Sequence, residues 1–288
     1  MTATVNRLSL NLRAMFGRSY PRVIGMQREP SWLFFETILP LLGIAAYVFI
    51  YKGFFLGLDA DPAANERLNA MIGFVVIGGT MIAFWLNVLW SMASQLYWEK
   101  EMGNLALYMM APMSRMALLA GMAVGGMFMT GTRAIVTLVA GIYVFGVVLT
   151  VTSPLLILAV FFVTLIALYG MGMMLASLYL LWGREAWHLS ALMEEPIFLV
   201  SGFYFPAKAL GQSIALGASI IPATLGLDAL RQLLFPSKAL SGIWILPPDT
   251  ELAILLVLAV LFLFLARASL AYLEVLARRE GRLTSRHQ

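Results

Sequence analysis

Long apolar stretches restrict the fold of this chain more than any other feature of its sequence. Hydrophobic residues make up 61% of the 288 residues and charged residues only 12%, which is about half the charged share of a soluble domain. So few charges cannot cover a surface in water, whereas a bilayer accepts apolar helices of about 20 residues. We therefore predict an all-α membrane protein with six transmembrane helices, at about residues 32–55, 71–93, 116–149, 154–181, 190–206 and 252–272.

The basic residues predict how the chain is oriented. With six crossings, twelve Lys and Arg residues fall on the side of the two termini and five on the opposite side. Cytoplasmic segments are enriched in these residues, so both termini are predicted to be cytoplasmic. The net charge of +4 does not indicate a nucleic-acid partner, because the arginines gather at the ends of the membrane segments.

Three regions follow from this pattern. Residues 1–30 mix arginines with recurring apolar side chains, which predicts an N-terminal amphipathic helix lying in the cytoplasmic surface of the bilayer. Residues 31–273 form the predicted six-helix transmembrane domain, and residues 274–288 form a basic cytoplasmic tail. The lipid bilayer is therefore the first partner that the sequence implies.

The stretch between the fifth and sixth predicted spans is apolar but short. Residues 207–221 lie between Pro206 and Pro222, and about 15 helical residues extend only about 22 Å. We predict an extracellular re-entrant helical hairpin at residues 206–222, packed against protein because irregular backbone does not face lipid. An ordinary large outer loop is the alternative.

A short helix is predicted after this hairpin. Residues 225–235 combine apolar and polar side chains and are expected to lie at the outer interface of the membrane. Asp228 and Arg231 are three residues apart on one face of that helix and are expected to pair with each other.

Three carboxylates fall inside predicted spans, where ionisable residues are costly and often functional. Glu36 follows the start of the first span, and Glu194 and Glu195 follow the start of the fifth. The distances from the span ends place all three at similar depth in the inner leaflet. They are candidate contacts for cationic or hydrogen-bonding cargo at an inward-facing entrance. The alternative is structural, with Glu195 capping the helix break at Pro196.

No residue pattern indicates catalysis, a bound cofactor or a metal site in this chain. The sequence has no cysteine, which excludes thiolate ligands and cysteine nucleophiles. None of its four lysines follows a glycine, as the lysine of a phosphate-binding P-loop must. The histidine-glutamate metal motif and the serine nucleophile elbow are also missing. We therefore expect no catalytic, cofactor-binding or metal-binding residues here.

Two motifs carry a resemblance to a known family. The first is EKEMG at residues 99–103, followed by PMSR at residues 112–115. The second is EPIFLVSGFYFP at residues 195–206, followed by IPAT at 221–224 and DALR at 228–231. Their order and spacing, over about residues 28–272, resemble the transmembrane permease subunit of type-2 ABC exporters.

That resemblance implies a cytoplasmic coupling helix at about residues 97–113, seated on a separate ATP-binding subunit that holds ATP and Mg²⁺. Met102, Leu105 and Met109 recur at helical spacing and form an apolar stripe suited to a groove on a partner. The alternative is that the stripe rests on lipid. The residues implied in coupling are Glu99, Lys100, Glu101, Met102, Gly103, Leu105 and Met109.

The resemblance also implies the function of the chain. It predicts one permease of an ATP-driven exporter in the cytoplasmic membrane of a prokaryote, working with a second permease copy, usually as a homodimer. The cargo would be an amphiphile, such as a drug-like molecule, a lipid or a lipid-linked glycan. A stand-alone secondary transporter or channel is the first alternative, although such proteins often show repeated halves. An ATP-linked subunit without cargo is the second alternative.

Overall fold

The computed structural model describes residues 7–56, 62–182, 186–235, 240 and 242–280 of the chain. This part is helical and contains no strand. Five of its helical segments are long and apolar enough to cross a membrane, so the chain is a multi-pass α-helical membrane protein. The elements are α1 (Arg7–Arg28), α2 (Pro30–Phe54), α3 (Pro62–Leu86), the π-helix η1 (Asn87–Met92), α4 (Gln95–Glu101), α5 (Asn104–Met110), α6 (Arg115–Tyr143), α7 (Pro154–Trp182), α8 (Ala186–Val200), the 3₁₀ helix η3 (Ala207–Leu210), α9 (Gln212–Ala218), α10 (Pro222–Leu234) and α11 (Pro248–Glu280).

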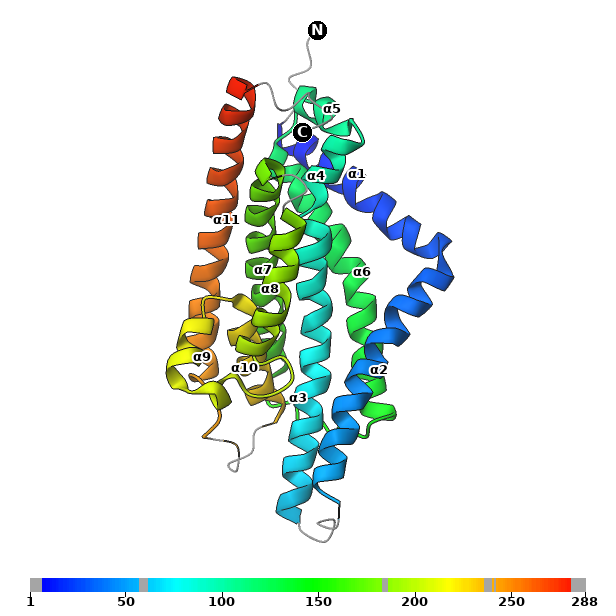
Figure 1. Ribbon diagram of the computed structural model, residues 1–288, viewed down its shortest axis with the longest axis vertical. Coiled ribbons are helices and arrows are strands. Elements are labelled where there is room, and N and C mark those ends of the chain that lie inside the picture. The colour runs from blue at the N-terminus through cyan, green and yellow to red at the C-terminus, as the bar shows by residue number, and fades with distance from the viewer. Residues whose placement is uncertain (1–6, 57–61, 183–185, 236–239, 241, 281–288) are drawn as a thin grey trace.

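The long helices run side by side along one axis (Figure 1). Helix α7 packs along α11, and α1 packs against the first half of α6. The start of α1 and the end of α11 lie at one end of the bundle, together with α4 and α5. For convenience we call this the α4–α5 end.

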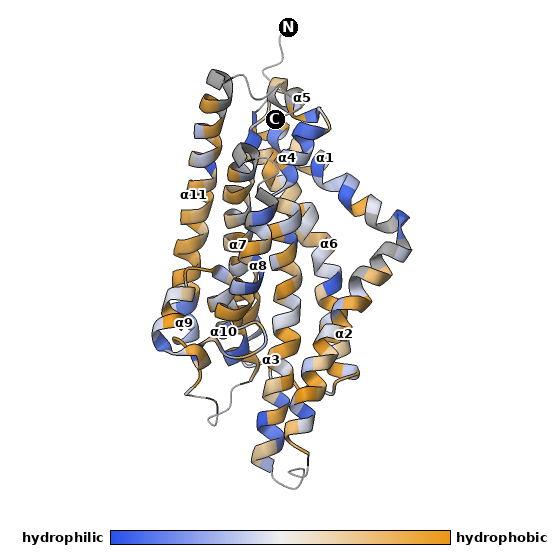
Figure 2. Cartoon of the chain, viewed as in Figure 1, coloured by the Kyte–Doolittle hydropathy of each residue, from blue (hydrophilic) through white to orange (hydrophobic). Residues whose placement is uncertain are grey.

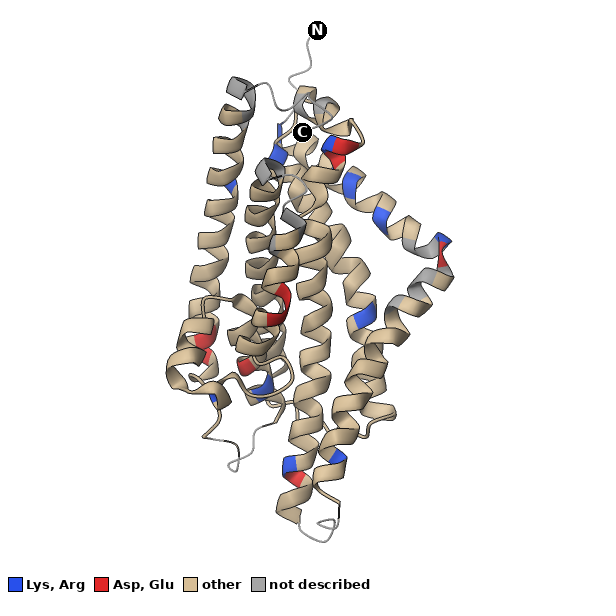
Figure 3. Ribbon diagram, in the orientation of Figure 1, with Lys and Arg blue, Asp and Glu red and all other residues tan. Residues whose placement is uncertain are grey.

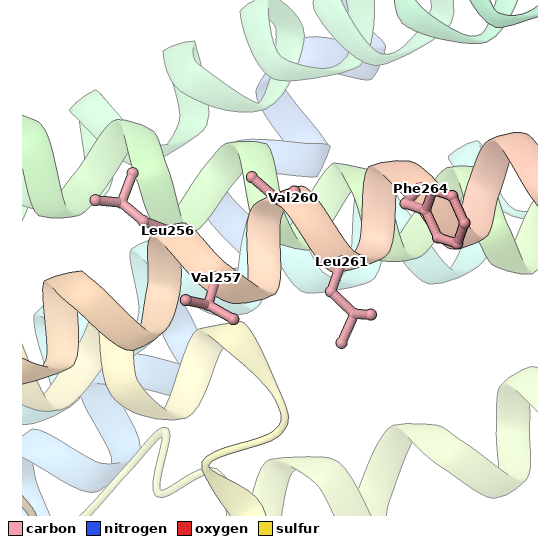
Figure 4. Close-up of a pocket in the computed structure, with 5 residues that line it drawn as sticks. All are labelled: Leu256, Val257, Val260, Leu261 and Phe264. Atoms are coloured by element: carbon pink, nitrogen blue, oxygen red, sulfur yellow. The ribbon is translucent and has the colours of Figure 1, made fainter.

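Apolar side chains dominate the sides of the bundle (Figure 2), and charged residues are few along its length (Figure 3). Helix α11 illustrates the outward surface, because five of its exposed apolar side chains line an open groove (Figure 4). These residues are Leu256, Val257, Val260, Leu261 and Phe264. A surface of this kind suits hydrocarbon rather than water.

The region of the predicted fifth span departs from a simple crossing. Helix α8 has 15 residues, which at 1.5 Å each extend about 22 Å, short of the roughly 30 Å hydrocarbon layer. Helices α9 and α10 follow and meet at an angle of 115°, so that together they form a broken span or a re-entrant loop. Pro206 directly precedes η3, and Pro222 starts α10. The sharp bend therefore lies in residues 219–221, directly before Pro222, and α10 belongs to the bent pair.

The prediction that residues 225–235 lie at the outer interface is wrong. Eleven of the 13 residues of α10 are buried, in contacts with α3, α7 and α11. The two charged residues that made the sequence look interfacial, Asp228 and Arg231, are buried too, and each has hydrogen-bond partners within the protein.

Arg231 holds the irregular backbone that follows α8. Its guanidinium is 2% exposed and donates to the carbonyl oxygens of Gly202 (2.7 Å) and Phe203 (2.8 Å). A further bond reaches the carbonyl of Phe74 in α3 (2.8 Å). Backbone carbonyls at a break inside a membrane protein need such donors, since lipid offers none. Arg231 thus joins α10, α3 and the end of α8.

The expected pairing of Asp228 with Arg231 is also wrong. Both residues are described, and no ion pair joins them. Asp228 instead accepts from the backbone N–H of Ile245 (2.8 Å) and from the amide of Gln232 (3.0 Å). Backbone carbonyls bind the guanidinium of Arg231. The loop before α11 supplies the N–H of Ile245 that binds Asp228.

We predict that Gly78→Ala destabilises the protein, whereas Gly43→Ala does not. A Cβ at Gly78 in α3 would overlap the carbonyl oxygen of Phe203, and a backbone atom cannot easily move away. We expect a loss of about 1–3 kcal/mol, measured as a lower thermal unfolding temperature in detergent.

Gly43 in α2 is the matched control, because a Cβ there meets nothing within 4 Å. Alanine should leave stability unchanged or raise it by up to about 1 kcal/mol through helix propensity. Equal unfolding temperatures for the two variants would contradict the close approach of α3 to Phe203.

Candidate functional site

The segment between α3 and α6 folds into two short helices. Helix α4 ends at Glu101, and α5 starts at Asn104. Gly103 between them has a φ of 78°, in the left-handed region that glycine enters most easily. The single helix predicted over residues 97–113 is therefore divided into two, because the left-handed backbone conformation of Gly103 changes the direction of the chain.

Glu99 is the centre of this segment. Its side chain is only 1% exposed and forms an ion pair with Arg18 of α1. The amides of Gln95 and Asn104 donate to its two carboxylate oxygens, each at 3.1 Å. A buried carboxylate is stable when it is paired and hydrogen-bonded in this way. Glu99 thus connects α1, α4 and α5.

Two further contacts fix α1 against α5. The guanidinium of Arg18 donates to the hydroxyl of Tyr108 (3.3 Å) and lies 5.8 Å from the centre of its ring. Burial raises the pKa of Tyr108, which keeps the phenol protonated. Asn11 accepts a hydrogen bond from the backbone N–H of Ser114 (2.8 Å), just after α5.

Arg22 ties α1 to η1, α4 and α6. It donates to the hydroxyl of Ser91 (2.8 Å), the carbonyl of Met122 (3.1 Å) and the amide oxygen of Gln95. Burial, and then the nearby charge of Arg18, lower the pKa of Arg22. Neutral acceptors on three other segments therefore surround this guanidinium.

The backbones of α1 and α6 touch each other. A Cβ at Gly121 would lie 2.6 Å from the carbonyl oxygen of Met15, and one at Gly125 would lie 3.2 Å from the Cα of Ser19. Glycines four residues apart on one helix are a common means of close helix packing in membranes. They bring α1 near enough to α6 for Arg18 and Arg22 to reach their partners.

Polar contacts continue from this site into the bundle. Asn87, the first residue of η1, accepts a hydrogen bond from the hydroxyl of Tyr169 in α7 (2.8 Å). Both side chains are buried. π-helical turns frequently occur at functional sites, and η1 lies directly between α3 and the α4–α5 segment.

The predicted coupling residues divide between interior and surface. Glu99 and Leu105 are buried at 1% and 2% exposure, and Lys100 and Gly103 are half-buried. Glu101 and Met102 are exposed. Met109 lies in α5, but its side chain is outside the described part of the structure. Among the described residues of α4, α5 and the turn between them, the exposed large apolar side chains are Trp98, Met102, Leu107 and Met110.

The sequence reading missed the residues of α1 that complete the site. Arg18 is 81 residues from Glu99 in the chain, and no local pattern links them. The only available signal was the regular recurrence of arginines in residues 1–30, which hydropathy alone attributes to the membrane surface.

The carboxylates predicted at a transport entrance are in different surroundings. Glu194 of α8 accepts a hydrogen bond from the indole N–H of Trp90 in η1 (2.8 Å). Glu195 is exposed. Glu36 lies in α2, and its side chain is outside the described residues. The structure thus gives Glu194 a partner in η1 and leaves Glu195 at the surface of α8.

Comparison with known proteins identifies the family. The sequence model of the ABC-2 type transporter family matches residues 14–235, which include most of α1 and all of the α4–α5 segment, α8 and α10. The chain belongs to this family. An ABC-2 membrane domain is a permease rather than a catalytic domain, and it normally works with an ATP-binding subunit. The chain is therefore a transmembrane component of a transporter. No curated protein matches the sequence.

We predict that Glu99→Gln loosens α1 from the α4–α5 segment of this permease. A glutamine keeps the size of the side chain but removes the charge that Arg18 binds, at an expected cost of about 1–2 kcal/mol. The variant should unfold at lower temperature and be cleaved faster by protease within α1.

Glu101→Gln is the control, because Glu101 carries the same charge two residues away and is exposed. Its effect on stability should stay within about 0.5 kcal/mol. A Glu99→Gln variant that behaves like this control would show that the buried ion pair does not hold α1.

Proposed function

We propose that this chain is the permease subunit of an ATP-driven exporter and that α4 and α5 dock on a separate ATP-binding subunit. The observation that carries the proposal is the Arg18–Glu99 ion pair, whose carboxylate is buried, in a segment with exposed apolar side chains. A firmly held base with exposed apolar side chains is what helix-in-groove recognition requires. The acidic first residue of the EKEMG motif has its role inside this base rather than in the docking contact.

Coupling would pass through the same contacts. Closure of the ATP-binding subunits displaces α4 and α5, and Glu99 carries α1 with them. Arg22 extends the connection to Ser91 in η1 and to Met122 in α6. A push at the α4–α5 end therefore moves the helices that surround the transport pathway.

ATP and Mg²⁺ belong to the partner in this proposal, because the sequence offers no glycine-lysine pair for a P-loop. A second copy of the permease, as a homodimer, would complete the pathway. We also propose that α8 and the re-entrant pair α9–α10 together complete a sixth crossing. The excess of Lys and Arg at the α4–α5 end supports a cytoplasmic location for both termini, and we propose the cytoplasmic membrane of a prokaryote.

An amphiphilic cargo, such as a drug-like molecule, a lipid or a lipid-linked glycan, fits the surroundings of α8. Figure 3 places the acidic residues of this helix about half-way along the long helices. The ring of Tyr204, in the segment that follows α8, stacks on the ring of Tyr47 in α2, with 4.1 Å between the ring centres. An exposed carboxylate at Glu195 beside aromatic rings offers charge and apolar surface together, as an amphiphile needs.

We predict that Met102→Glu weakens docking of the ATP-binding subunit without harming the fold. Met102 is 57% exposed, so its replacement should leave stability within about 0.5 kcal/mol. A charge in an apolar contact should reduce affinity about tenfold or more, measured by co-purification and by stimulation of ATP turnover.

Met102→Leu is the control and should dock normally, since it keeps an apolar side chain of similar size. Normal docking of the Met102→Glu variant would argue against this surface. Transport by the purified chain alone under an ion gradient would instead support the secondary transporter or channel. Docking and ATP turnover without any movement of cargo would favour the subunit without cargo.

We predict that Glu195→Gln selectively slows transport of cationic amphiphiles. Removal of the exposed charge should lower uptake of a cationic dye into inverted vesicles about tenfold, while transport of a neutral amphiphile and docking stay unchanged. Glu195→Asp, which keeps the charge, is the control. An equal loss for both dyes would assign Glu195 a structural role at the break near Pro196.

A further inference from the structure

Two carboxyl groups are buried together between α10 and α11, away from the α4–α5 end. Asp228 is 3% exposed and Glu251 is 0% exposed. The amide nitrogen of Gln232 lies 3.0 Å from Oδ2 of Asp228 and 3.3 Å from Oε2 of Glu251. One amide thus donates to both carboxyl groups and holds them side by side. None of the interactions proposed for transport uses this pair.

Two buried carboxyl groups that share one amide donor are stabilised when one of them carries a proton. Oε1 of Glu251 is buried, and no described N–H or O–H group donates to it with ordinary geometry. An unpaired carboxylate in such a site would carry a large desolvation cost, which protonation removes. Two like charges this close would also repel each other.

The neighbouring charged groups are committed elsewhere. Arg231, one turn along α10, donates to four backbone carbonyls. Lys208 donates to the carbonyl of Trp244 (2.9 Å), and Asp249 in the first turn of α11 is exposed. At Oδ2, Asp228 accepts from the backbone N–H of Ile245 (2.8 Å) and the amide of Gln232 (3.0 Å). Glu251 accepts a longer bond from Gln232 (3.3 Å) and one from the backbone N–H of Leu246, and its Oε1 has no described donor. The shorter bonds favour the ionised form at Asp228. The proton therefore belongs on Glu251.

We propose that Asp228 and Glu251 form a proton-binding site, in which one proton on Glu251 is shared with the carboxylate of Asp228. The bound proton attaches the buried helix α10 to the start of α11. It leaves one negative charge in the site, which the positive N-terminal end of α11 and Arg231 favour. Any state in which α10 separates from α11 would expose the pair to water and release the proton.

The test compares Glu251→Gln with Glu251→Ala in the full chain. Glutamine imitates a protonated glutamate, since its amide donates to Asp228, and its unfolding temperature should remain near that of the wild type. Alanine removes the donor and should lower that temperature by about 5 °C or more. Infrared difference spectra of wild type against Glu251→Gln at neutral pH should contain the carbonyl band of a protonated carboxylic acid.

Two results would overturn the proposal. One is a Glu251→Gln variant as unstable as Glu251→Ala, because an ionised glutamate would then be required. The other is the lack of a carboxylic-acid band in the difference spectrum, which needs no unstable variant. Both measurements use the permease without its ATP-binding partner, so they are independent of the docking proposal.

Discussion

Hydrocarbon supplies no hydrogen bonds, and this constraint accounts for much of the architecture. Helices satisfy their own backbone, but the chain between α8 and α10 does not. The carbonyls freed there at Gly202 and Phe203 are bonded by the buried guanidinium of Arg231. Because the same group reaches Phe74 in α3, the repair of one break also fixes the relative positions of three segments. The irregular element is therefore held firmly where a plain loop would not be.

The same constraint shapes the site at the α4–α5 end. Charged side chains that leave water need partners, and Glu99 obtains them from α1, α4 and α5 at once. These interactions connect the three helices more than they stabilise the fold, because the attraction within a buried ion pair roughly offsets the cost of removing both charges from water. A network of this kind specifies which helices move together. The EKEMG motif therefore has a buried carboxylate, that of Glu99, and a turn whose side chains at Glu101 and Met102 are exposed.

The sequence was sufficient for properties that depend on local composition. Apolar runs predicted the long spans, and the motifs predicted the family, because both are recorded in consecutive residues. Partners far apart in the chain could not be predicted, such as Arg18 with Glu99 or Glu194 with Trp90. Helix α10 misled the hydropathy argument for a related reason. Asp228 and Arg231 signal water exposure when read alone, and only the tertiary contacts show that both are satisfied in the interior.

The glycines between α1 and α6 have a mechanical consequence. Side chains that separate two helices act as a compliant layer, because they change rotamer and absorb small displacements. At Gly121 the backbone of α6 faces the carbonyl of Met15 directly, with no such layer between them. A tilt of α1 is then transmitted directly to α6, because no side chain at this contact can change its conformation and absorb the movement.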